Sequence, residues 1–184
     1  MEIIEFFEST KVHTTVVHVI SVIFGMGSAL VSDILFTFFS KDKKLNNTEI
    51  NTLSILSKIV LASLFFIIIS GLAIFVTDID KYLNSAKFMS KMAIMAILLI
   101  NGYILNNYIW NNLIKKDFFI SNRLRSVRRL AFIAGSISVV SWVFVCILGI
   151  INQLDYNFYQ IIFAYLIVIL FASIASIFIE SKKY

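Results

Sequence analysis

The chain contains no proline and only one cysteine, Cys146, among its 184 residues. A single cysteine excludes an internal disulfide and any CxxC redox or zinc motif. Membrane carriers commonly use broken helices and duplicated halves, and this sequence has neither a proline to break a helix nor an internal repeat. These absences favour a rigid bundle over an alternating-access carrier, although a carrier formed by dimerisation stays open.

Charged residues are also scarce. They make up 15% of the chain, whereas about a quarter of the residues are charged in a typical soluble domain. Hydrophobic residues make up 59%, the mean hydropathy is +0.90, and there are 18 phenylalanines. This composition indicates an integral membrane protein. The net charge of +5 does not indicate nucleic-acid binding, because the basic residues cluster between apolar runs.

Five apolar runs are long enough to cross a bilayer as helices, which takes about 20 residues each. The sequence therefore predicts an all-α, polytopic membrane bundle in a single transmembrane domain that covers residues 1–184. The acidic N-terminal residues lack the basic region and cleavage site of a secretory signal, so we expect the first span to stay in the mature protein. The predicted spans are residues 14–39, 53–76, 88–109, 130–151 and 158–179.

Lysine and arginine are spread unevenly over the segments that connect these spans. One set of segments holds Lys41, Lys43, Lys44, Lys115, Lys116, Arg123, Arg125, Arg128, Arg129, Lys182 and Lys183, and the other holds Lys11, Lys81 and Lys87. Because basic residues mark cytoplasmic loops, we predict an N-out, C-in topology in the bacterial inner membrane. The arginine cluster at residues 123–129 is also expected to contact anionic lipid.

Two ionisable residues lie inside the predicted spans, toward the outer face: His18 in the first span and Lys91 in the third. Such residues are costly in hydrocarbon and often mark a cofactor, an ion or a proton relay. His18 is interpreted as a haem or metal ligand, or as a neutral histidine bonded to a neighbouring helix. Lys91 is interpreted as a second ligand, a propionate partner or a proton-handling group, or as a lysine that snorkels to the headgroups. His13 falls on a different helix face and is expected at the interface.

Methionines offer an alternative set of ligands, because thioethers favour Cu(I). In this interpretation copper is bound by His18, Met26, Met89 and Met92. Methionine is also a common filler of packing gaps, and we prefer that interpretation for Met89, Met92 and Met95.

Other polar residues in the spans receive structural interpretations. Asp33 and Lys58 are expected to form an ion pair near the inner face. Asn101, Asn106 and Asn107 are expected to form hydrogen bonds between helices. The chain contains no HExxH, GxSxG, P-loop or GxGxxG motif, so no catalytic residue is predicted.

A series of short motifs follows the order seen in a known family. The motifs are VHVI (residues 17–20), FGMG (24–27), SK (57–58), SGL (70–72), KFMSKM (87–92) and NG (101–102). In order and spacing they resemble the first four spans of copper-resistance protein D (CopD)-type membrane domains and of the membrane-type protoporphyrinogen oxidase HemJ. The chain departs from that pattern at Phe24, where the family has tryptophan, and at Ser32-Asp33, where the oxidase has basic residues. With Ser32-Asp33 at that position, the chain is similar to uncharacterised bacterial relatives of the family.

The resemblance implies a role for His18 and Lys91, which match a histidine and a lysine associated with haem b in the haem-binding relatives. We therefore expect a membrane protein that binds haem b or a related redox centre near the outer face; a haem-dependent oxidoreductase is the enzyme class that would fit. The alternatives are copper transport or handling and a cofactor-free structural subunit. The expected partners are the lipid bilayer and a second copy of the chain or a redox partner.

The topology is testable with fusions at two points of the chain. A fluorescent reporter that folds only in the cytoplasm, joined after Tyr184, should be bright, because the basic residues keep that end inside. Alkaline phosphatase inserted at residues 152–157, a segment without lysine or arginine, should be active outside. A phosphatase fusion that is active at the C-terminus would overturn the orientation.

Overall fold

The computed structural model describes residues 2–115, 118–151 and 155–183, and within these ranges the regular structure is entirely helical. The elements are α1 (Glu2–Phe39), the 3-10 turn η1 (Ser40–Asp42), α2 (Asn47–Val76), α3 (Ile79–Leu83), α4 (Ala86–Tyr103), the π-helical segment η2 (Ile104–Ile109), α5 (Trp110–Leu113), the 3-10 turn η3 (Asn122–Leu124), α6 (Arg125–Ile150) and α7 (Phe158–Lys183). Five helical segments of the described chain are long and apolar enough to cross a bilayer, and α4, η2 and α5 together make one of them. The predicted all-α polytopic bundle of five spans is confirmed.

Most helices extend beyond the predicted spans, because polar caps rather than the edge of the apolar run decide where a helix begins. Asn46 and Glu49 form a capping box at the start of α2, with hydrogen bonds of 2.9 Å and 2.8 Å between side chains and main-chain N–H groups. Ser85 caps α4 through the N–H of Phe88. The 38 residues of α1 make a helix about 57 Å long at 1.5 Å per residue. Since the hydrocarbon core is about 30 Å thick, α1 extends well outside it.

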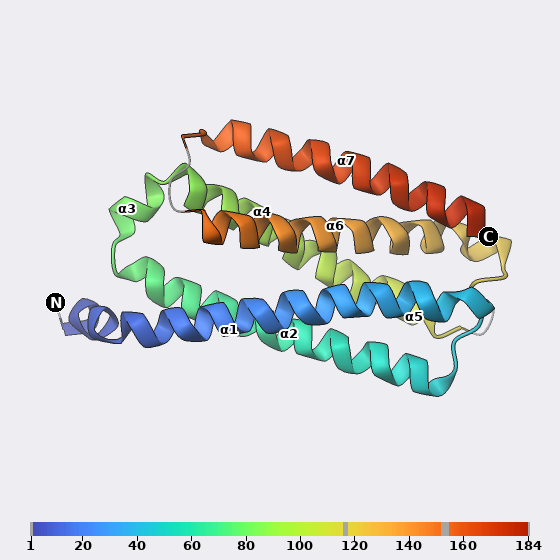
Figure 1. Ribbon diagram of the computed structural model, residues 1–184. Coiled ribbons are helices and arrows are strands. Elements are labelled where there is room, and N and C mark those ends of the chain that lie inside the picture. The colour runs from blue at the N-terminus through green and yellow to red at the C-terminus, as the bar shows by residue number, and fades with distance from the viewer. Residues whose placement is uncertain (1, 116–117, 152–154, 184) are drawn as a thin grey trace.

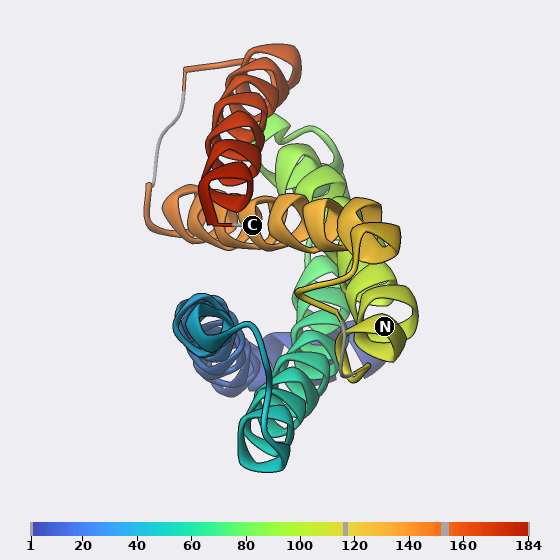
Figure 2. The same cartoon turned by 90° about the vertical axis from the view of Figure 1, so that its right-hand side faces the viewer.

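The central helix of the bundle is α6 (Figures 1 and 2). It contacts α7, α4 and α1, while α1 and α2 form an antiparallel hairpin with a long shared interface. Figure 2 shows α7 and the α1–α2 hairpin on opposite sides of α6. The two ends of the chain lie at opposite ends of the bundle, as an odd number of crossings requires.

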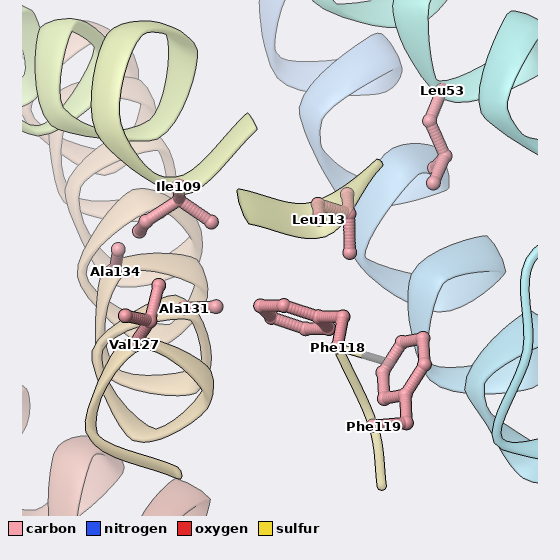
Figure 3. Packing of buried hydrophobic residues seen from close by; sticks show 8 residues of the cluster. All are labelled: Leu53, Ile109, Leu113, Phe118, Phe119, Val127, Ala131 and Ala134. Atoms are coloured by element: carbon pink, nitrogen blue, oxygen red, sulfur yellow. The ribbon is translucent and has the colours of Figure 1, made fainter. Parts of the chain in front are cut away.

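Three clusters of buried apolar residues hold these helices together. The cluster shown in Figure 3 lies where α2, the η2–α5 segment and α6 meet, and its buried members are Leu53, Ile109, Leu113, Phe118, Phe119, Val127, Ala131 and Ala134. A second cluster includes Tyr165 and joins α4, α6 and α7. A third includes Trp142 and joins α1, α2, α4 and α6.

Trp142 of α6 occupies the space left by the missing side chain of Gly25 on α1. The indole is fully buried. A Cβ atom at Gly25 would lie 2.5 Å from Cη2 of Trp142 and 3.0 Å from Cβ of Ser63 on α2, which is well inside van der Waals contact. Small residues let helices approach closely in lipid, and here the glycine lets one large side chain contact both helices of the hairpin.

A buried ion pair fixes α7 to α6 within the same chain. Glu180 of α7 is 1% exposed and accepts hydrogen bonds from Nε of Arg128 at 2.8 Å and from Nε of Arg129 at 3.4 Å. Arg128 is 4% exposed and also donates through Nη1 to the carbonyls of Phe118 and Phe119, at 3.3 Å and 3.2 Å. The guanidinium therefore ties a connecting segment, α6 and α7 together at one point.

The burial of Arg128 corrects the interpretation of the arginine cluster. Arg123 and Arg125 are exposed, which suits contact with lipid headgroups or water. Lipid contact is wrong for Arg128, because its charge is paired inside the protein. The sequence alone did not indicate this pair, since its two members are 52 residues apart.

Replacing Glu180 with glutamine should destabilise the bundle strongly. The change keeps the shape but leaves the buried Arg128 guanidinium without its counter-charge, and breaking a buried pair in this way costs about 3–5 kcal/mol. Thermal unfolding of the detergent-purified protein would measure the loss. Glu8→Gln, at an exposed position of α1, is the matched control. Equal melting of both variants would contradict the structural role of the pair.

Candidate functional site

His18 lies half-buried at the interface between α1 and α2. Its Nδ1 atom is 2.9 Å from Oγ of Ser70 on α2. Gly71, the next residue along α2, lies against the ring, because a Cβ atom there would be 3.5 Å from Cε1 of His18 and 3.8 Å from Nδ1. The histidine is thus fixed in orientation by the neighbouring helix.

The hydrogen bonds of Ser70 assign the tautomer of His18. The Ser70 hydroxyl has one proton, and its Oγ lies 2.5 Å from the carbonyl oxygen of Phe66 and 3.3 Å from that of Ile67. Since a carbonyl only accepts, the hydroxyl donates to the main chain and its oxygen accepts from Nδ1–H of His18. In this arrangement the proton is on Nδ1 and the lone pair of the ring is on Nε2. Ligating histidines are commonly oriented by such a bond from the other ring nitrogen.

Lys91 lies half-buried on α4. Lys87, one turn earlier, donates a short hydrogen bond from Nζ to the main-chain carbonyl of Ile151 at the end of α6. Two cationic side chains therefore face the end of the bundle where His18 lies. A site shared by His18 and Lys91 stays a prediction.

The methionines occupy two different environments. Met89 and Met92 are turned outward on α4 and are 40% and 50% exposed. Met26 and Met95 instead pack against the buried cluster around Trp142. Met26 is eight residues from His18 on the same helix, which is about 12 Å along the axis. His13 is exposed, at a level of α1 about 7 Å before His18.

The predicted ion pair between Asp33 and Lys58 is wrong. Lys58 is exposed on α2, and Oδ2 of Asp33 is a buried atom without a hydrogen-bond partner. The carboxylate instead faces α6, where a Cβ atom at Gly135 would be 3.1 Å from Oδ1 of Asp33. The sequence predicts a similar membrane depth for Asp33 and Lys58, but depth does not give the direction of a side chain. Asp33 points into the bundle and Lys58 points outward.

The expected interhelical bonds of the asparagines are present for two of the three residues. Nδ2 of Asn101 donates to the carbonyl of Ala134 on α6 at 2.9 Å, in a buried position. Oδ1 of Asn106 accepts from Ser57 of α2 at 3.5 Å. Asn107 is exposed, and the bond recorded there runs within its own helix, from Nδ2 of Asn111 to the Asn107 carbonyl.

Neither a cluster of acidic ligands nor one of histidine and cysteine is present in the described parts of the chain. No group of three or more His, Cys, Asp or Glu side chains there is placed to hold a metal ion. A metal at His18 would therefore need its other ligands from outside this set, such as Lys91 or the ring nitrogens of a porphyrin.

Ser70 is the residue of this site whose role the sequence did not indicate. It belongs to the SGL motif at residues 70–72. Its depth is the signal that points to His18, because His18 is near the start of the first predicted span and Ser70 is near the end of the second, which is the same end of the bundle. Comparison of the chain with protein-family models, curated proteins and solved structures finds no match, so the geometry carries the functional argument.

The tautomer of His18 can be measured directly, because the chain has only two histidines. In protein labelled with 15N-histidine, His18 should show the Nδ1-protonated pattern, since Ser70 accepts that proton. His13→Asn assigns the spectrum by removing the other signal. Ser70→Ala should abolish the fixed tautomer. A wild-type His18 protonated on Nε2 would contradict the assignment.

Proposed function

We propose that this multi-pass membrane protein resides in the bacterial cytoplasmic membrane and binds haem b, or a related redox centre, near its outer face. In this proposal the imidazole of His18 would hold the iron. The observation that carries it is the hydrogen bond from Nδ1 of His18 to Ser70, which orients the ring and leaves Nε2 free to coordinate.

The residues around His18 suit this role in two respects. The hydroxyl of Ser70 keeps Nε2 unprotonated, as coordination requires, and holds the ring to α2. Lys91, half-buried on α4, would serve as a second ligand or as a partner for a propionate. Bound haem would supply one-electron chemistry. The chain would hold it in place and set its potential through the Ser70 bond and the apolar surroundings.

The resemblance to CopD-type and HemJ-like membrane domains supports the same assignment. In that pattern a histidine on the first span and a lysine entering the third are associated with haem b, and His18 and Lys91 hold those positions here. The departures at Phe24 and at Ser32-Asp33 separate the chain from the oxidase members. We therefore propose haem binding without assigning the oxidase reaction.

Copper handling has less support from the geometry. Of the four residues proposed for it, Met89 and Met92 face outward and Met26 packs into the core. A cofactor-free structural role uses the same His18–Ser70 bond and gives no function to the free Nε2. Both alternatives remain distinct outcomes of the test below.

The absorption spectrum of the purified protein tests the proposal. Protein from cells supplied with a haem precursor should show a Soret band, which should be absent from His18→Ala and unchanged in His13→Ala, because His13 is exposed and away from the site. Ser70→Ala should weaken binding by about 10–100-fold, the usual effect of losing the partner of a ligating histidine. Size-exclusion profiles and helical content of each variant check the fold.

Lys91→Ala separates the two roles proposed for the lysine. Loss of an opposing ligand would change the spin state and the spectrum, whereas loss of a propionate partner would weaken binding with the spectrum unchanged. A colourless protein with stoichiometric copper would replace haem with the copper alternative. A colourless, metal-free protein would contradict both.

A further inference from the structure

A second candidate site lies farther along α1, in a cavity of about 140 Å³. The cavity lies between α1, α2, α6 and the third crossing, which is made of α4, η2 and α5. Its walls are mostly aliphatic, and the polar groups on them come from Asp33, Ser32, Ser57, Asn106 and Ser138. Asp33 is 15 residues from His18 on the same helix, which is about 22 Å along the axis. The cavity is therefore separate from the His18 site.

Asp33 is the ionisable group of this cavity. Its Oδ2 atom is buried and has no hydrogen-bond partner, and no lysine, arginine or histidine is among the described residues that line the space. Buried carboxylates are normally paired or hydrogen-bonded, because leaving one alone is costly in a medium of low dielectric. An acidic group placed in this way next to an open space provides a binding point for a single positive charge.

The shape and lining of the cavity favour an organic cation over a metal ion. A divalent cation needs several oxygen ligands, commonly with more than one carboxylate, and the described lining contains one carboxylate. The cavity has the volume of several water molecules at about 30 Å³ each, which is more than a bare ion fills. Phe36 and Trp110 add aromatic rings to its walls, and aromatic faces attract ammonium groups.

The side of the cavity between α2 and the third crossing gives access. Leu61 of α2 and Asn106 of η2 both line the cavity and are exposed on the outside of the bundle. A 3.5 Å hydrogen bond joins Ser57 to Asn106 across this side. The wall on the side of the third crossing includes the π-helical segment η2, and π-helical turns are frequent at functional sites. A ligand that enters here would come from the level of the bilayer.

We propose that this cavity binds a small amphiphilic organic monocation, of the class of a primary amine with an apolar body, and that Asp33 is its counter-ion. The hydroxyls of Ser32 and Ser138 and the amide of Asn106 supply further acceptors for the ammonium group, and the aliphatic and aromatic walls contact the apolar body.

Benzylammonium and benzyl alcohol are the probes for this proposal, because they share a shape and differ in charge. Isothermal titration of the detergent-purified full chain should give saturable binding of benzylammonium. The alcohol should bind at least about thirtyfold more weakly, since losing one partner of a buried charge pair costs that much or more. Equal binding of the two probes, or no saturable binding of the amine, would overturn the proposal. The second result would leave Asp33 as a group that binds only a proton.

Two variants locate the binding. Asp33→Asn keeps the size of the side chain and should weaken amine binding by about thirtyfold or more, whereas Asp155→Asn, at an exposed carboxylate, should not change it. Ser138→Leu fills the cavity while keeping the charge, and should weaken both probes. Amine binding that survives Asp33→Asn places the site elsewhere and contradicts the proposal. If Asp33→Asn does not fold, the comparison of the two probes on the wild-type chain still decides.

Discussion

The packing of Trp142 against Gly25 and Ser63 is the contact on which the arrangement of the helices depends. In lipid the association of helices gains little from the hydrophobic effect, because the surrounding chains are as apolar as the side chains, so close packing must do more. The α1–α2 hairpin contacts α6 through α1, and the indole of Trp142 is the largest fully buried side chain there. It fits only because residue 25 lacks a Cβ atom.

Polar side chains inside the bundle are found in three different arrangements. Arg128 and Glu180 neutralise each other and are further held by main-chain carbonyls. His18 is hydrogen-bonded through Nδ1 to the hydroxyl of Ser70. Asp33 has one oxygen without any partner. The Arg128–Glu180 pair is complete within the chain, so its role is structural. In the two proposals above, the imidazole of His18 and the carboxylate of Asp33 instead each bind a ligand.

The five spans could be predicted from the sequence because a span depends on position along the membrane normal. Hydropathy gives that position for each apolar run. The partners of Asp33 and Arg128 depend instead on rotation about the helix axis and on which helices are neighbours. Lys58 lies at a suitable depth for Asp33 but points away from it, and Glu180 meets Arg128 only because α7 packs on α6. The chain carries no proline or repeat that would have indicated the π-helical segment.

The π-helical segment η2 shifts the inward-facing positions along the third crossing, which is made of α4, η2 and α5. The buried residues of α4 are Ser90, Ile94, Leu98 and Asn101, and continuing the same α-helical spacing would bring Tyr108 and Asn112 to the inner face. The i→i+5 bonds of a π turn take in one residue more than those of an α turn. The inner positions are accordingly Ile109 and Leu113, while Tyr108 is 53% exposed. The inward-facing positions after η2 are therefore shifted by one residue relative to those of α4. A helical wheel drawn at a constant spacing through the whole crossing would place the wrong residues of its second half on the inner face.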